Sequence, residues 1–267
     1  MKKILFFLTT IIIVLICSTN VNASTTFYEG EYIDNIYMNK QKAGSSTIYY
    51  QKARFFRQTG TNRFAYCIDP FVFFQDGSIY EETITPSNLT ASQKEQISLI
   101  AYFGYGYKNH TDTKWYAITQ FMIWQAADPT GNFYFTDGLN GPRITAYTNE
   151  MNEINNLINN YKKQTSLNNK TYTLLEGESL SVADTNNVLS NYKSSNPNFI
   201  ISGNKLTSSS LTEGVYQIDL IREENYHNAP LLFYQSANSQ ALMQTGNLSN
   251  KQEHLQVEVI KTEIEIT

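Results

Sequence analysis

The 267-residue sequence has only two cysteines, Cys17 and Cys67. Cys17 ends an apolar run that follows two lysines and precedes a short polar stretch ending in Ala23, which is typical of a secretory signal peptide. We predict a signal peptide over residues 1–23, cleaved after Ala23. Cleavage leaves Cys67 alone in an exported chain. This excludes an intramolecular disulfide and leaves either a buried, inert thiol or a reactive one.

Two other fates of the N-terminal segment fit the sequence less well. A lipoprotein attached through Cys17 needs Gly or Ala where Ile16 stands. A retained anchor needs about 20 apolar residues to span a bilayer, and this run is shorter. No second apolar run follows it, so we expect no membrane insertion after cleavage.

Charge is also scarce, at 16% of the residues, with a net charge of −4 and no basic block. Such a chain offers no electrostatic surface for nucleic acid or for an anionic membrane, and we expect neither as a partner. Aromatic residues are abundant instead, with 19 Tyr and 15 Phe. They supply enough apolar surface for a sizeable core.

The residues after the signal peptide divide into two predicted domains. The first, residues 24–167, opens with strand-like segments separated by turn residues, and Pro70 ends the strand that carries Cys67. Three helical patterns follow. The first opens with a Ser92-x-x-Glu95 capping box. The predicted strands cover residues 27–28, 32–37, 47–56 and 64–68. The second predicted helix begins near residues 111–113 and runs to 127, and the third covers 148–164.

The second predicted domain, residues 168–267, alternates short apolar runs with turn residues, which is typical of an all-β sandwich. We expect it to be a stalk or accessory domain. The predicted fold class is therefore α+β: a β-rich domain with a three-helix insertion, followed by an all-β sandwich-like domain. The strands expected in this half cover residues 171–175, 199–201, 214–222, 231–234 and 255–260.

Two short motifs carry the chemistry. One is Tyr66-Cys67-Ile68-Asp69-Pro70, and the other is the helical segment 115–124, WYAITQFMIW. On that helix Gln120 shares a stripe with Ala117 and Trp124, so we expect it to point inward. A buried carboxamide is costly unless its donors and acceptor are satisfied. Acylation of a cysteine is one reason to bury it.

Together these motifs resemble the Cys-Gln thioester domains of Gram-positive bacterial surface adhesins. In that family an aromatic-Cys dipeptide on a strand pairs with a Thr-Gln on a helix that continues to a Trp. The resemblance covers residues 25 to 165 and departs from the family at Met122, where Ala is usual. It implies a thioester between Cys67 and Gln120. The supporting residues expected around it are Tyr66, Thr119 and Trp124.

In the implied reaction, the Cys67 thiolate attacks the Gln120 carbonyl and expels ammonia, and no cofactor or metal is needed. The resemblance further implies that a lysine amine on a host surface or matrix protein attacks this thioester and stays bound to Gln120. We therefore expect a monomeric, single-turnover adhesin rather than an enzyme. It would be secreted or held at the cell surface, anchored to the cell wall through a longer C-terminal region.

Several alternatives stay open at this stage. Gln125 lies about 140° around the helix from Gln120, so only one of them can face Cys67. His110 fits a solvated loop, but it could also act as the base of a secreted cysteine peptidase or amidase that uses Cys67. Asp69 fits ordinary turn chemistry before proline, and Thr119 fits a bond to its own helix. A non-covalent carbohydrate- or protein-binding module is the third reading.

Overall fold

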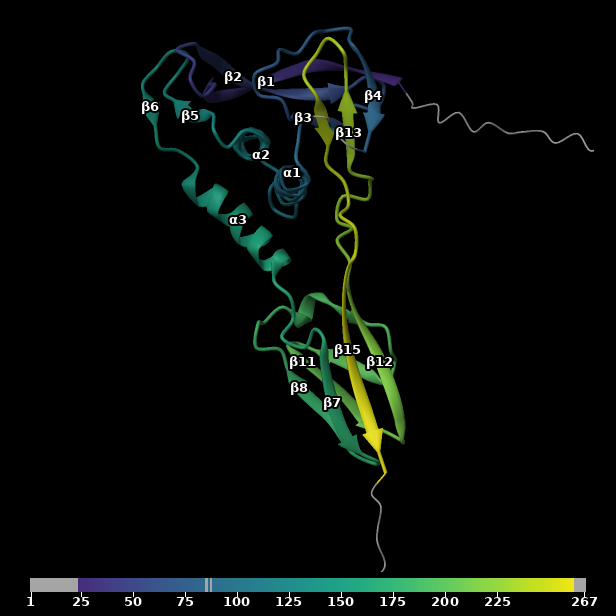
Figure 1. Cartoon of the computed structure of the whole chain (residues 1–267). Helices are drawn as coiled ribbons and strands as arrows, with labels where there is room; N and C mark the ends of the chain where they lie inside the picture. Colours follow the sequence, from purple (N-terminus) through teal and green to yellow (C-terminus); the bar gives the residue numbers. More distant parts are fainter. Residues whose placement is uncertain (1–23, 85, 87, 262–267) are drawn as a thin grey trace, which may run out of the picture.

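The computed structural model describes residues 24–84, 86 and 88–261. The predicted signal peptide and its cleavage site lie outside these residues. The chain folds into two lobes, each with its own hydrophobic core. Figure 1 shows the helices and the larger sheet in one lobe and two smaller sheets in the other.

The larger lobe is built on an eight-stranded sheet with the order β2-β3-β14-β13-β4-β1-β5-β6. Because β1 pairs with β2 as well as with β4, six of these strands close into a ring. The ring encloses an aromatic core. The strands are β1 (Ser24–Gln41), β2 (Ile48–Gln58), β3 (Phe64–Cys67), β4 (Ile79–Thr83), β5 (Asn132–Thr136), β6 (Arg143–Ile144), β13 (Leu232–Gln235) and β14 (Leu242–Gln244).

This sheet differs from the predicted division at residues 167/168. Strands β13 and β14 come from the half that we assigned to the second domain, yet they lie between β3 and β4. Their buried side chains, among them Phe233 and Leu242, belong to the core of the larger lobe. An alternating apolar pattern identifies a strand but not the sheet that it joins, which is why the sequence placed these strands wrongly.

Three helices complete this lobe: α1 (Ala91–Phe103), α2 (Thr113–Ala127) and α3 (Thr148–Lys162). Helix α2 packs on the sheet, while α1 and α3 pack against α2 and against each other. The capping box of α1 is Thr90 with Gln93, not the predicted Ser92 with Glu95. The Thr90 hydroxyl accepts a bond from the Gln93 N–H, and the Gln93 side chain accepts one from the Thr90 N–H. The described helices include none that is long and apolar enough to cross a membrane.

The smaller lobe holds the remaining strands in two sheets, ordered β7-β15-β12-β9 and β10-β11-β8. Two side chains tie it to the end of α3: the Lys251 ammonium donates to the Lys163 carbonyl at 2.6 Å, and the Arg222 guanidinium donates to the Asn160 carbonyl at 3.3 Å. The strands are β7 (Lys170–Leu175), β8 (Ser179–Ala183), β9 (Lys193–Ser194), β10 (Phe199–Ser202), β11 (Lys205–Ser210), β12 (Gly214–Arg222) and β15 (Lys251–Ile260).

Candidate functional site

Cys67 is the last residue of β3, and it is a free cysteine with no exposed surface. Strand β14 pairs with β3 so that Leu242 lies directly opposite Cys67. The bond from the Ile68 N–H to the Ala241 carbonyl, at 3.0 Å, continues the pairing past the strand end. Residues two apart point to the same face, so Gln240 becomes the diagonal neighbour of Cys67, within reach of a long side chain.

The Cys67 sulfur contacts the side chain of Gln240. The thiol donates to Gln240 Oε1 at 2.7 Å and also lies 3.2 Å from the Asp69 carbonyl oxygen. A C=O bond is about 1.23 Å long, so the Gln240 carbonyl carbon is at most about 3.9 Å from the sulfur. Gln240 is buried, and its Nε2 has no hydrogen-bond partner among the described residues. No hydrogen bond to a described residue therefore restrains the amide nitrogen of Gln240.

Gln120 also reaches Cys67, as predicted, but it binds the backbone and not the sulfur. Its Oε1 accepts from the Cys67 N–H at 2.8 Å, and its Nε2 donates to the Cys67 carbonyl at 2.8 Å. Both functions of the buried carboxamide are thereby satisfied. The side chain acts as a neighbouring strand would, completing the main-chain bonds of Cys67 where pairing with β2 has ended.

Tyr116, one helical turn before Gln120, also forms hydrogen bonds with main-chain groups of the strands. Its hydroxyl accepts from the Phe56 N–H at 2.9 Å and donates to the Ala65 carbonyl, so it bridges β2 and β3. Four helical residues rise about 6 Å, and two strand residues rise about 6.6 Å. Tyr116 and Gln120 on α2 therefore match Ala65 and Cys67 on β3.

A buried cation lies next to the thiol. The Lys40 ammonium sits 4.6 Å from the centroid of the Trp124 ring, and only 7% of Lys40 is exposed. Burial raises the pKa of the Cys67 thiol, while the Lys40 charge, the Trp124 indole N–H and the Asp69 backbone act in the opposite direction. Burial lowers the pKa of Lys40, and the charges of Cys67 and Asp69 oppose this. Burial thus disfavours the charged form of both groups.

The other predicted supporting residues take structural places. Tyr66 stacks on Tyr116 with ring centroids 4.7 Å apart, and its buried hydroxyl has no hydrogen-bond partner among the described residues. The Thr119 hydroxyl donates to the Trp115 carbonyl in its own helix at 2.6 Å and accepts from the Tyr105 N–H at 3.0 Å. It holds the turn after α1 against α2.

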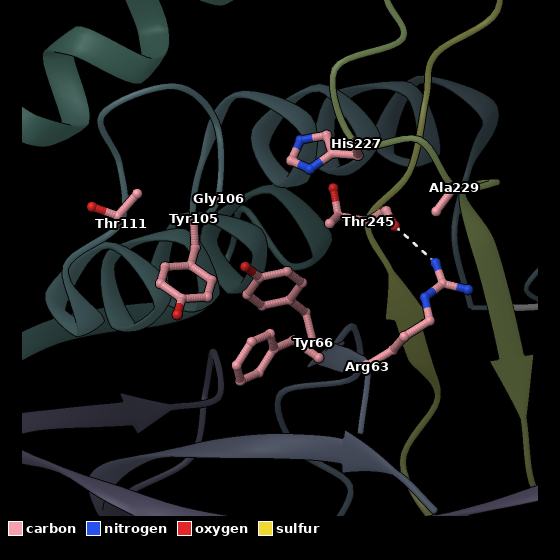
Figure 2. A pocket seen from close by; sticks show the side chains of 9 residues that line it. Arg63, Tyr66, Tyr105, Gly106, Thr111, His227, Ala229 and Thr245 are labelled. Carbon is pink, nitrogen blue, oxygen red and sulfur yellow. Dashed lines mark hydrogen bonds between the residues drawn. The ribbon is translucent and has the colours of Figure 1, made fainter. Parts of the chain in front are cut away.

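Two pockets are lined by β3 residues or by the residue that contacts Cys67. One, of about 380 Å³, is lined by both Lys40 and Gln240, with Tyr49, Tyr50 and Phe73 at its rim. Figure 2 shows the other, where Tyr66, Tyr105, His227 and Arg63 surround a space of similar size. Of these two pockets, only the first has in its wall a residue that contacts the Cys67 sulfur.

His110 is buried, in contrast to the predicted solvated loop. Its Nδ1 lies 2.7 Å from the Phe103 carbonyl oxygen, its Nε2 lies 3.1 Å from Glu153, and its ring stacks on Trp115 at 3.6 Å. These contacts hold the loop between α1 and α2, and the Cys67 thiol has other partners. The Cys-His contact that a cysteine peptidase requires is absent from the described residues.

Sequence reasoning singled out neither Gln240 nor Lys40. Gln240 precedes the apolar run Ala241-Leu242-Met243, much as Gln120 precedes Phe121-Met122, and that likeness is the one local signal for it. Lys40 has none, because nothing in the sequence shows that a strand lysine will be buried. In the described part of the chain no cluster of His, Cys, Asp and Glu could hold a metal ion.

The chain is similar to known thioester-domain proteins. Residues 64–175 match the family model "Thioester domain", a segment that contains Cys67 and Gln120 but not Gln240. The solved thioester domain of the Staphylococcus aureus TIE protein is 21% identical, with a TM-score of 0.61 over 90% of this chain and 100% of that one. The Bacillus anthracis TIE protein is 15% identical, with a TM-score of 0.41 over 89% of this chain and 49% of that one.

No curated protein matches the sequence. The likeness to the Staphylococcus aureus structure shows a common fold that spans both lobes, since nearly all of this chain is covered. The family match covers the strand that bears Cys67 and all three helices. The chain is therefore similar to thioester domains in sequence over residues 64–175 and in fold over most of its length.

Proposed function

We propose that Cys67 and Gln240 form the internal thioester of this domain. The observation that carries the proposal is the 2.7 Å contact between the Cys67 sulfur and Gln240 Oε1. The sulfur attacks the side-chain carbonyl carbon of Gln240, a C–S bond forms, and the C–N bond breaks. The amide nitrogen leaves as ammonia with the thiol proton. Holding the reacting atoms in contact supplies much of the rate.

In this proposal Gln120 positions the cysteine and is not acylated. Both of its polar atoms are engaged by the Cys67 main chain. Those bonds fix the φ/ψ of the last β3 residue and so the direction of its thiol. The thioester between Cys67 and Gln120 that the sequence predicts is the competing assignment, and the same experiment separates the two.

The thioester serves to capture a primary amine. A lysine side chain on a host surface protein enters the pocket lined by Lys40 and Gln240 and attacks the Gln240 carbonyl. A C–N bond forms, the C–S bond breaks, and the Cys67 thiol is restored. The resulting amide is stable, so each molecule reacts once, as an adhesin at the cell surface does and an enzyme does not. The burial of Cys67 and Gln240 supports this role, because it shields the thioester from water.

The test is the intact mass of the mature protein. We expect it to be ~17 Da below the calculated value, the mass of one ammonia, with the Cys67 thiol blocked to titration. Methylamine should then add its full mass and release the thiol. The Cys67→Ala variant, which cannot form a thioester, should show the calculated mass and take up no methylamine.

Peptide mapping of the methylamine adduct assigns the glutamine. We expect the label on the peptide that contains Gln240. We also expect Gln240→Glu to abolish the mass deficit, because a carboxylate has no ammonia to lose. A label on Gln120 would overturn the Gln240 assignment. An unmodified mass with a freely titrating thiol would overturn the thioester itself.

A further inference from the structure

Lys40 is the only buried lysine among the residues that the structure describes. Lysine is almost never fully buried unless it is paired, so its place in the core needs a reason. Its ammonium lies over the Trp124 ring at 4.6 Å, an attraction worth about 2 kcal/mol when desolvated. This contact alone does not favour lysine over an apolar residue of the same length, because removing the ammonium from water costs more.

The second observation is where Lys40 lies. It shares the wall of the pocket with Gln240, the residue in contact with the Cys67 sulfur. The groups whose charges act on it are Cys67 and Asp69, at the end of β3. Tyr49 lies directly opposite Lys40 on β2 and lines the same pocket. The charge of the exposed Lys42 lowers the pKa of the Asp69 carboxyl, against the effect of burial. Farther along the same pocket Glu29 and Arg54 form an ion pair with each other.

We propose that Lys40 carries the proton in both the formation and the capture step of this thioester. The inference rests on the Cys67–Gln240 thioester proposed above. In formation, the neutral Lys40 amine takes the proton of the Cys67 thiol, and the resulting ammonium gives it to the departing nitrogen of Gln240. The products are the thioester, ammonia and a neutral Lys40, so every proton is accounted for.

Capture is the same reaction run backwards, with a substituted amine in place of ammonia. Both directions pass through a tetrahedral carbon at Gln240 that carries the sulfur and a nitrogen. The group that protonates the leaving nitrogen in one direction must deprotonate the attacking nitrogen in the other. Lys40 therefore takes a proton from the incoming amine and returns it to the Cys67 sulfur as that sulfur leaves.

The electrostatics suit this exchange. Burial raises the pKa of the thiol and lowers that of Lys40, so it disfavours the charged form of each group. A thiol that does not ionise by itself needs a proton acceptor, and general acid-base transfer works best when the pKa of the acceptor lies near the working pH. A fixed cation such as arginine could stabilise a thiolate but could not accept its proton.

The test compares Lys40→Met, which keeps the length and removes the amine, with Lys40→Arg, which keeps the charge and cannot exchange the proton. Lys42→Met is the matched control, two residues along at an exposed position. Hydroxylamine is the probe, because it is uncharged from neutral pH upward and leaves only the protein to titrate in that range. Its uptake is followed by intact mass between pH 7 and pH 10, with thermal melting as the check on folding.

We expect both Lys40 variants to take up hydroxylamine at least about tenfold more slowly than the wild type. We also expect them to lose the rise in rate with pH that the wild type shows as Lys40 deprotonates, while Lys42→Met behaves as the wild type. If a Lys40 variant is isolated at its full calculated mass although it melts as a folded protein, the formation step has been lost, which also supports the proposal.

Three outcomes would overturn it. One is a rate within about twofold of the wild type for both variants. A second is a normal rate for Lys40→Arg alone, which would show that a fixed charge suffices. The third is a wild-type protein that shows the mass deficit but has a free Cys67 thiol and takes up no hydroxylamine, while either Lys40 substitution abolishes the mass deficit. That result would show that Lys40 itself is joined to Gln240. A wild-type protein without any mass deficit would contradict the thioester proposal itself. Failure of the thioester proposal is therefore distinguishable from failure of the Lys40 proposal.

Discussion

At the scale of single residues, burial acts on Lys40 through its charge. In the unfolded chain the lysine is fully hydrated, whereas in the fold its pKa is lowered by burial, with Cys67 and Asp69 opposing. The folded pKa of Lys40 lies below its unfolded value, which is near 10.4. The contribution of Lys40 to the free energy of unfolding is therefore most favourable above that unfolded pKa. It is lost as the pH falls through the folded pKa.

We therefore predict that Lys40→Met stabilises the fold at pH 7, by about 1 kcal/mol, and that the gain shrinks toward pH 10. Urea unfolding at the two pH values measures it. Both proteins should carry Cys67→Ala, so that neither the thioester nor the thiol contributes. A loss of stability at pH 7 would show that the Trp124 contact outweighs the cost of removing the ammonium from water.

The prediction from the sequence at this scale was partial. A lone exported cysteine and a glutamine on an apolar helical stripe were enough to bring Cys67 and Gln120 together, and the structure joins them by two hydrogen bonds. Which atoms of Cys67 meet Gln120 was not readable. That depends on where the edge of β3 lies against α2, and only the packed structure sets that position.

At the scale of elements, α2 works as a template for β3. Tyr116 and Gln120 supply main-chain bonds that a neighbouring strand would otherwise make. The helix is buried over the whole of residues 115–124, so its apolar pattern surrounds the axis and does not mark a single face. This explains why the sequence identified the helix and its ends but could not say which of its polar residues served the strand.

We predict that Tyr116→Phe lowers the free energy of unfolding by about 2 kcal/mol. The substitution removes the hydroxyl that pairs the Phe56 N–H and the Ala65 carbonyl, and each buried group left unpaired costs about 1–3 kcal/mol, partly relieved by local relaxation. Urea unfolding would show it. Tyr50→Phe, at an exposed position on β2, is the control and should change stability little.

The same substitution should slow thioester formation, because it loosens β3 two residues before Cys67. The fraction of protein that has lost ammonia, followed over time after refolding, measures this. Unchanged stability together with an unchanged rate would show that the hydroxyl only fills space between the two strands.

At the scale of the whole molecule, the two lobes are not two consecutive domains. The chain leaves the larger lobe through α3, builds most of the smaller lobe, returns to add β13 and β14, and leaves again through β15, as Figure 1 shows. The residue proposed to be acylated, Gln240, lies in the returning segment. The larger lobe is therefore incomplete without residues from far along the chain.

We predict that a chain ending at residue 167 forms no thioester, since it lacks β13, β14 and Gln240. Intact mass under the conditions used for the whole protein tests this. A second variant, with a flexible linker from residue 163 to residue 223 and an end at residue 250, keeps both strands and should still lose ammonia. A mass deficit of ~17 Da in the chain ending at residue 167 would be evidence for Gln120 as the acylated residue.

The sequence by itself determined the local elements and singled out Cys67. The three helices fall where their apolar periodicity and capping residues predict them, within a few residues, and Cys67 lies at the end of a strand that Pro70 closes. These features depend on neighbours within about one or two turns of chain, and such information is written locally.

Tertiary structure alone decided which glutamine touches the sulfur and that a lysine is buried beside it. Gln240 reaches Cys67 through the register between β14 and β3. The two residues are 173 positions apart in the sequence. Lys40 comes from a third strand, β1. Strand pairing across such distances is selected by burial of the whole core, and no local pattern of residues records the result.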